Sequence, residues 1–288
     1  MALVRPTSTP TRDPDQEQTR PASQPSSRTA RLAGSALALA ALLAIAGFTA
    51  LGSVFAYPQV LQEPVDAILT RFRAHQGAVV GWFGVLVVSA GLLAPAGVWL
   101  GRLAGGTLGR ATAAVAVAAA VVQVVGLQRW LTLVPTLSRD ALDPTRHAEA
   151  VRRFELWHTV LGTAIGETVG YALTATFTVL AVLGLRRRGL PRWLAAVGTG
   201  AAALIATGVA VPLVHLATLS NFVGYVLWCA WLLALAVWLF RAGGFTLEPE
   251  RPIQPSAGVH AQGQDRSPTS APESGEPASD LRPSAGRG

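Results

Sequence analysis

The chain has 288 residues, of which 51% are apolar and only 14% are charged, and its mean hydropathy is +0.41. Soluble domains carry about 25% charged residues, so this composition excludes an ordinary soluble enzyme, a disordered regulator and a small disulfide scaffold. Cys229 is the only cysteine, which also excludes an intramolecular disulfide and a CxxC metal site.

The two ends of the chain, residues 1–31 and 242–288, are predicted to be disordered tails. They hold 12 of the 19 prolines, and such Pro- and Ser-rich segments bury too little apolar surface to fold. Their arginines and acidic residues balance, so the net charge of +7 belongs to residues 32–241. There the arginines flank apolar runs, which indicates contacts with lipid headgroups and not with nucleic acid.

Residues 32–241 contain six apolar runs, at about 32–56, 77–100, 111–135, 154–185, 194–218 and 222–240. Each run is long enough to cross a hydrocarbon core, which takes about 20 helical residues. Backbone groups in lipid must bond within their own helix. The sequence therefore predicts an all-α membrane domain, a polytopic bundle of six transmembrane helices.

The arginines that flank these runs predict the orientation of the bundle. Cytoplasmic flanks are enriched in basic residues. We therefore expect both termini in the cytoplasm, with the protein in a bacterial cytoplasmic membrane. The inner flanks would then hold nine arginines: Arg28, Arg31, Arg102, Arg110, Arg186, Arg187, Arg188, Arg192 and Arg241. The outer loops would hold six: Arg71, Arg73, Arg139, Arg146, Arg152 and Arg153.

A short amphipathic helix is predicted at about 64–74, in the first outer loop. Pro64 suits a first helical turn. After it Val65, Ile68, Leu69 and Phe72 recur at helical spacing, with charged residues between them. We expect this helix to lie on the outer membrane face or to cap the bundle.

Glu167 is the most informative residue of the sequence. An acid in the middle of the fourth run costs about 2.5–3.5 kcal/mol to insert, so it should face other helices. It belongs to a polar stripe at α-helical spacing, formed by Thr163, Glu167, Tyr171, Thr174 and Thr178. Two interpretations stay open: a structural Glu held by hydrogen bonds, and a ligand or proton site.

The same run carries Gly162, Gly166 and Gly170, one residue in four. Small residues at this spacing let a neighbouring helix approach closely.

Arg129, in the third run beside Trp130, is the second residue that is costly to place in a membrane. Its side chain would either reach the outer headgroups or form an ion pair with Glu167 or Glu155.

Further polar residues gather at the outer level under this topology: His75, Glu155, His158, His215, Asn221 and Tyr225. Asn221 comes just before the sixth run and is predicted to cap that helix. His158 lies nine residues before Glu167, which places the two side chains on opposite faces of an α-helix.

No cofactor and no metal are predicted. The pair Glu155 and His158 has the spacing of a di-iron motif, but such sites need two copies and the sequence has one. A haem or metal held by two of His75, His158 and His215 is an alternative. Motifs for phosphate loops, nucleophile elbows and zinc proteases are absent from the sequence.

Four short stretches of the chain are similar to a known family. They are Tyr57-Pro58 with Leu61-Gln62-Glu63-Pro64 and Phe72, Gly166-Glu167-x-x-Gly170-Tyr171, Leu190-Pro191-Arg192-Trp193, and Asn221-Phe222-Val223-Gly224-Tyr225-x-x-Trp228. Together they resemble the bacterial six-helix membrane proteins known as domain of unknown function DUF4386. The resemblance implies architecture and transfers no catalytic residue.

These observations predict a non-enzymatic integral membrane protein with an outward-opening polar pocket for a small or lipid-like ligand. Membrane lipids would be its other partners. The candidate ligand-binding residues are Glu167, Arg129, His158, Tyr225, Tyr171 and Asn221. One alternative is a membrane redox protein or enzyme that uses the outer histidines. Another is a structural or interaction protein.

Overall fold

The computed structural model describes residues 27–210 and 216–242, and this part of the chain is helical without a strand. The predicted tails at 1–31 and 242–288 lie almost wholly outside these residues, as does His215. Six helical segments are long and apolar enough to cross a membrane: Ser27–Phe55, Gln76–Ala104, Gly106–Asp140, His147–Arg186, Arg192–Ala210 and Leu219–Ala242. The predicted all-α polytopic bundle is therefore confirmed.

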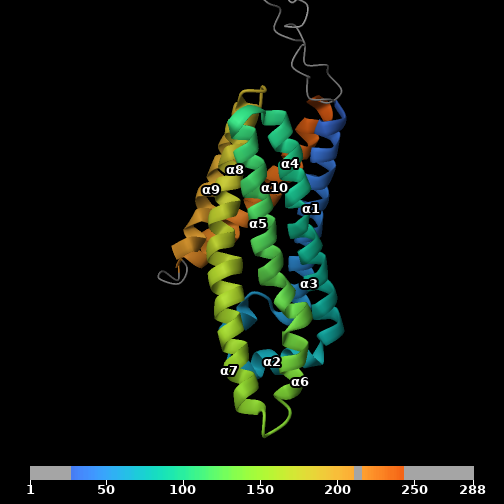
Figure 1. The fold of residues 1–288 in the computed structure, drawn as a ribbon, viewed down its shortest axis with the longest axis vertical. Helices are drawn as coiled ribbons and strands as arrows, with labels where there is room; N and C mark the ends of the chain where they lie inside the picture. Colours follow the sequence, from blue (N-terminus) through green and yellow to red (C-terminus); the bar gives the residue numbers. More distant parts are fainter. Residues whose placement is uncertain (1–26, 211–215, 243–288) are drawn as a thin grey trace, which may run out of the picture. The chain divides into compact units, whose positions relative to one another are not determined.

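Most of these segments are divided into consecutive helices (Figure 1). The first is α1 (Ser27–Phe55), and the second consists of α3 (Gln76–Gly91) and α4 (Leu93–Ala104). The third joins α5 (Gly106–Thr132) to α6 (Val134–Asp140). The fourth runs through α7 (His147–Trp157), the π-helix η3 (His158–Val169) and α8 (Gly170–Arg186). Last come α9 (Arg192–Ala206) with the 3₁₀ turn η4 (Thr207–Ala210), and α10 (Leu216–Ala242).

The third and fourth segments are longer than predicted. The apolar pattern ends near residue 135 and starts again near 154, whereas the helices continue to Asp140 and begin at His147. The added turns are amphipathic: Leu137, Ser138 and Ala150 are buried, whereas Arg139, Glu149, Arg152 and Arg153 are exposed. Figure 1 shows that α9 ends well short of the end of the bundle formed by α6 and α7.

Small residues let the helices pack closely in one half of the bundle. Gly101 of α4 lies against the backbone of Gly109 in α5, and Gly198 of α9 lies under the Trp231 ring of α10. The Trp231 indole donates to the Leu194 carbonyl at 3.0 Å. Close backbone approach and interhelical hydrogen bonds take the place of the hydrophobic effect inside lipid.

The other half of the bundle is closed by the short helix α2 (Val65–Ala74), which follows the 3₁₀ turn η2 (Gln59–Gln62). Figure 1 shows α2 lying across the end where α6 and α7 meet. Its Ile68, Leu69 and Phe72 are buried in an aromatic cluster with Phe83 and Trp130. The predicted amphipathic helix is confirmed, and it caps the bundle.

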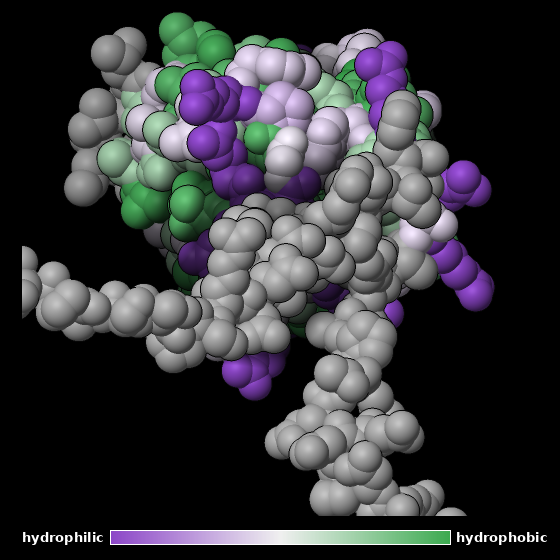
Figure 2. Space-filling model, turned by 90° about the horizontal axis from the view of Figure 1, so that it is seen from above, coloured by the Kyte–Doolittle hydropathy of each residue, from purple (hydrophilic) through white to green (hydrophobic). Residues whose placement is uncertain are grey.

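Charge is distributed unequally between the two ends. The nine arginines predicted for the inner side lie together at the start of α1, at the α4–α5 and α8–α9 connections and at the end of α10. We call this the basic end. In the view onto this end, Figure 2 shows hydrophilic residues at several places on the face and apolar residues toward its left edge. The described acidic residues other than Glu167 all belong to the opposite, mixed-charge end.

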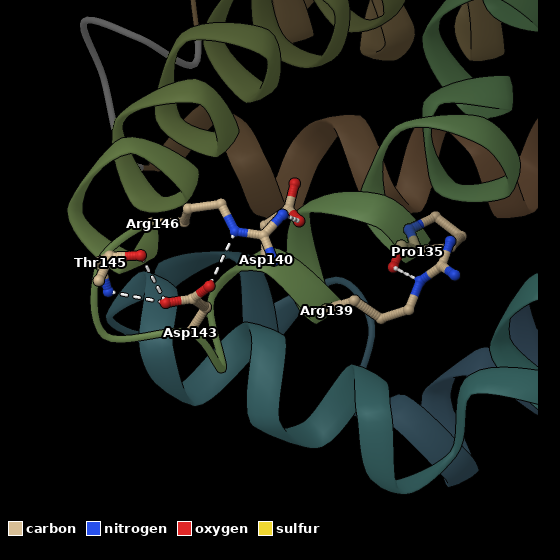
Figure 3. Close-up of polar contacts among 6 residues, drawn as sticks. All are labelled: Pro135, Arg139, Asp140, Asp143, Thr145 and Arg146. Atoms are coloured by element: carbon tan, nitrogen blue, oxygen red, sulfur yellow. Dashed lines mark hydrogen bonds and ion pairs between the residues drawn. The ribbon is translucent and has the colours of Figure 1, made fainter.

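At the mixed-charge end, the connection between α6 and α7 is held by Asp143 (Figure 3). Its carboxylate accepts hydrogen bonds from the Thr145 hydroxyl at 2.7 Å, the Thr145 amide at 2.9 Å and the Arg146 Nε at 3.0 Å. Arg146 also pairs with Asp140 at 2.8 Å. The two Thr145 donors and Arg146 lower the pKa of Asp143 to about 2, because they favour its charged form.

Candidate functional site

The site begins with an irregularity in the fourth segment. Twelve residues, His158–Val169, form a π-helix instead of an α-helix. The Thr168 hydroxyl donates to the Thr163 carbonyl five residues earlier, at 3.0 Å. π-Helices of this length are uncommon, and shorter ones often occur at functional sites.

The π-helix corrects the expectation that His158 and Glu167 lie on opposite faces. That expectation assumes α-helical geometry throughout. Bonds from residue i to i+5 widen the helix to more than four residues per turn. Nine residues then make about two full turns, which places His158 and Glu167 on the same side of η3. The step of four residues from Thr163 to Glu167, with which the predicted polar stripe begins, also lies within this π-helical stretch.

The predicted glycine series does pack closely, and its partner is α5. A Cβ on Gly166 would come within 3.1 Å of the Gly126 Cα, and Gly170 lies over Gln123. Gly162 faces the guanidinium group of Arg129, since a Cβ there would come within 2.7 Å of Nη2. These contacts fix the register of α5 against η3, with Arg129 about one turn nearer the mixed-charge end than Glu167.

Glu167 faces other helices, as its charge requires. It is half-buried. Its carboxylate interacts electrostatically with Arg129 of α5, Tyr57 before η2, Tyr171 of α8 and Tyr225 of α10. These three tyrosines are all the tyrosines in the chain. Among the described residues, however, none forms a hydrogen bond or ion pair with this carboxylate.

Tyr57 is a residue that sequence reasoning did not assign to the site. It lies in the connection between α1 and η2 and packs edge-on against Phe83 with ring centres 5.3 Å apart. Burial raises the pKa of Tyr57 to about 12; the Glu167 charge adds to this effect and Arg129 opposes it. Its hydroxyl is therefore neutral at physiological pH and can donate a hydrogen bond.

On the side of Glu167 that faces the basic end, hydrogen bonds between helices satisfy the neighbouring polar side chains. Gln123 donates to the Thr174 hydroxyl at 2.7 Å, and the Tyr225 hydroxyl also faces Thr174. The Trp228 indole donates to the Thr178 hydroxyl at 2.8 Å. Gln123 was missed as a site residue; the available signal was that it is an amide with two valines on either side of it in α5. The Glu167 carboxylate, by contrast, has no hydrogen-bond partner among the described residues.

Arg129 is buried, with 5% of its surface exposed. Its Nη1 donates to the Gly126 carbonyl of its own helix, and the guanidinium carbon lies 5.5 Å from the centre of the Trp130 ring. No described carboxylate forms an ion pair with it, neither Glu167 nor Glu155. The side chain therefore neither extends to bulk solvent nor is neutralised by direct contact.

His158 lies close to Arg129 on the opposite wall of a small hollow between α5–α6 and α7–η3. Its ring stacks on Phe154 at 5.8 Å, and its Nδ1 is buried without a hydrogen-bond partner among the described residues. The rest of the lining is apolar: Leu133, Val134, Leu137, Phe154 and Trp157.

Two other predicted polar positions do not join this site. His75 and Glu155 are exposed on the mixed-charge end. Within the described residues no three His, Cys, Asp or Glu side chains are grouped closely enough to hold a metal ion.

Asn221 is placed differently from the prediction. It was expected to cap the sixth helix, but α10 begins at Leu216 and Asn221 lies inside it. Its Nδ2 donates to the Ile205 carbonyl at 2.9 Å, near the point where α9 gives way to a 3₁₀ turn. Gly208 lies between Asn221 and the Tyr171 ring, so Asn221 is at the border of the site.

The helical rise locates the site along the bundle. Nineteen residues separate Arg110 from Arg129 on α5, and nineteen separate Glu167 from Arg186 on the fourth segment. At about 1.5 Å per residue both stretches are about 28 Å long, close to the roughly 30 Å of a hydrocarbon core. With the basic end at one interface, this length would place Arg129 near the other interface, and Glu167 closer to that interface than its position in the middle of the fourth apolar run suggested.

A family model, described as a domain of unknown function (DUF4386), matches residues 32–236. No curated protein and no solved structure shows significant similarity to the chain. The family match includes at least part of each of the six candidate spans and every residue of the site.

Proposed function

Because the chain belongs to the family described as domain of unknown function DUF4386, whose description assigns no activity, we propose a function from its own residues. We propose that this multi-pass membrane protein is not an enzyme and binds a small or lipid-like ligand at the polar site around Glu167. Arg129, Tyr171 and Tyr225 would contact the ligand, with His158 and Asn221 at the borders of the site.

The unpartnered carboxylate of Glu167 carries this proposal. A carboxylate within a membrane-spanning helix is costly unless it is paired, yet no described residue bonds Glu167, while nearby Gln123 and Thr174 bond each other. Arg129 and three tyrosine hydroxyls from separate parts of the fold surround it. Such an arrangement suits a ligand that supplies the missing partners.

The charge distribution supports a location in a bacterial cytoplasmic membrane, with the basic end and both termini in the cytoplasm. The site would then open toward the outer side.

The rival functions predict different properties. A membrane redox protein that uses His75, His158 or His215 would carry a haem absorption band or stoichiometric metal after purification. A purely structural Glu167 would leave all ligand binding unchanged when neutralised. A visible absorption spectrum with elemental analysis separates the first rival from the proposal.

The test of the proposal is native mass spectrometry of the wild-type protein, Glu167→Gln and the matched control Glu155→Gln. Glu155 is an exposed acid on the same segment. We expect the wild type and Glu155→Gln to retain a bound molecule, and Glu167→Gln to lose about nine-tenths of it. Equal occupancy in all three proteins, with equal thermal stability, would contradict the proposal.

A further inference from the structure

The hollow between α5–α6 and α7–η3 has a composition that selects one class of ligand. Its polar groups are the Arg129 guanidinium and His158, and no described residue in its lining is acidic. The remaining walls are apolar. A positive group at the base of an apolar hollow favours an anion that carries a hydrocarbon chain.

Both polar groups have unused hydrogen-bonding capacity. Arg129 carries five N–H donors, and among the described residues it uses one of them in a hydrogen bond to the Gly126 carbonyl. Its guanidinium is buried without a carboxylate in the described part of the chain. The Nδ1 atom of His158 is buried and unpartnered as well. Buried polar atoms are normally satisfied, so this pair calls for an acceptor that binds between them.

The level of the hollow agrees with a lipid headgroup. Arg129 lies about 28 Å from the arginines of the basic end, hence near the far interface. Two tryptophans flank it: Trp130 is buried behind Arg129, and Trp157 is 39% exposed at the rim. Tryptophan is enriched where hydrocarbon meets headgroups. An amphiphile in the adjoining leaflet has its anionic oxygens at this depth.

The size of the hollow limits what it can take. Its cavity volume is about 10 Å³, which is room for about one water molecule. A single anionic oxygen of a carboxylate or phosphate can enter it, while the rest of the headgroup stays outside and an acyl chain is excluded. The chain would remain in the bilayer, along the apolar rim formed by Leu133, Leu137 and Trp157.

We infer that this hollow binds the anionic headgroup, carboxylate or phosphate, of a membrane amphiphile, with Arg129 as the cation and His158 as a second donor. The inference rests on the proposed function, and it names the class of ligand that binds in the part of the site nearer the mixed-charge end. Arg129 also borders Glu167, so an amphiphile bound here is positioned next to the polar site.

The test uses the full-length protein in phosphatidylcholine nanodiscs. Spin-labelled stearate, spin-labelled phosphatidylglycerol and spin-labelled phosphatidylcholine are titrated, and the immobilised fraction is read by electron paramagnetic resonance. We expect one or both anionic probes to bind at least about tenfold more tightly than phosphatidylcholine. Preference for stearate or for phosphatidylglycerol distinguishes a carboxylate from a phosphate headgroup. Equal binding of all three probes would overturn the inference.

Two variants and one control locate the binding. Arg129→Gln removes the cation, and Leu133→Trp fills the hollow while Arg129 itself is kept. Each should weaken binding of the anionic probe about tenfold or more. Arg152→Gln, which neutralises an exposed arginine of α7, should leave it unchanged. If Arg129→Gln fails to fold, Leu133→Trp decides the matter, and unchanged binding in it would overturn the inference.

Two further results separate this inference from the proposed function. If inorganic phosphate at millimolar concentration displaces the probe, the site takes a soluble anion and the amphiphile assignment is wrong. If Glu167→Gln loses its native ligand while Arg129→Gln and Leu133→Trp bind the anionic probe as the wild type does, the proposed function stands and the inference fails.

Discussion

Gly126 of α5 and Gly166 of η3 lie back to back, so closely that a Cβ on Gly126 would come within 2.7 Å of the Gly166 Cα. The same Cβ would come within 3.1 Å of the Leu161 carbonyl oxygen. Neither neighbour is a flexible side chain, so neither can move without shifting a helix. This contact holds Arg129 over Gly162, one turn away, and so positions the candidate site.

We therefore expect Gly126→Ala to destabilise the protein by about 1–3 kcal/mol, because overpacking against backbone forces helices apart. The measurement is thermal unfolding in detergent. The matched control is Gly200→Ala in α9, where a Cβ meets nothing within 4 Å. It should leave the unfolding temperature unchanged or slightly higher, since Ala favours a helix more than Gly does. Equal effects in the two variants would contradict the assigned contact.

The number of spans, their approximate bounds and the capping helix could all be predicted from apolar periodicity. The glycine series at 162, 166 and 170 also predicted close packing, although its partner α5 could not be named from one sequence. Packing partners depend on which helices are neighbours in space, and apolar runs of similar composition carry little information on that.

The π-helix could not be predicted, and it changes the site most. Hydrophobic periodicity assumes the α-helical repeat, so it placed His158 and Glu167 on opposite faces. The position of Asn221 failed for a related reason: the helix begins five residues earlier, because segment ends are set by contacts with α9 and not by local capping preference. Arg129, Glu167, Tyr171 and Tyr225, by contrast, were found by their cost or rarity in an apolar segment, and they do lie close together.

Asn221→Ala should destabilise the protein modestly. The Asn221 amide donates to the Ile205 carbonyl near the end of α9 and so joins α10 to α9. Interhelical hydrogen bonds in membrane proteins are worth about 0.6 kcal/mol on average and at most about 1.7. We expect a loss in this range by denaturant titration in mixed micelles. Thr176→Ala is the control, because Thr176 is exposed and bonds only within its own helix in the described structure; a loss as large there would argue against a specific role for Asn221.

The topology of the bundle can be tested with reporter fusions. Fusions after Arg188 should report a cytoplasmic location, and fusions at Asp140 an external one, because nine arginines gather at the basic end. Removing the charge of Arg186, Arg187 and Arg188 together by substitution with Gln should lower the fraction of molecules in this orientation. A periplasmic-type reporter that is active after Arg188 in the wild type would reverse the assignment of inside and outside.

Asp143 gives a prediction that involves pH. The pKa of its carboxyl is lowered from 3.8 to about 2, chiefly by the Thr145 hydroxyl, and then by the Thr145 amide and Arg146. Because the pKa is lower in the folded protein, the charged Asp143 stabilises the loop at any pH above the pKa of the unfolded chain. This stabilisation is lost as the pH falls through about 2. Carbon-13 NMR of Asp-labelled protein should show one carboxyl that titrates near pH 2 and is absent in Asp143→Asn. Thr145→Val should move that titration toward the ordinary value, whereas Thr136→Val, on the exposed side of α6, should not. A titration near the ordinary value in the wild type would mean that the loop shown in Figure 3 is not formed in solution.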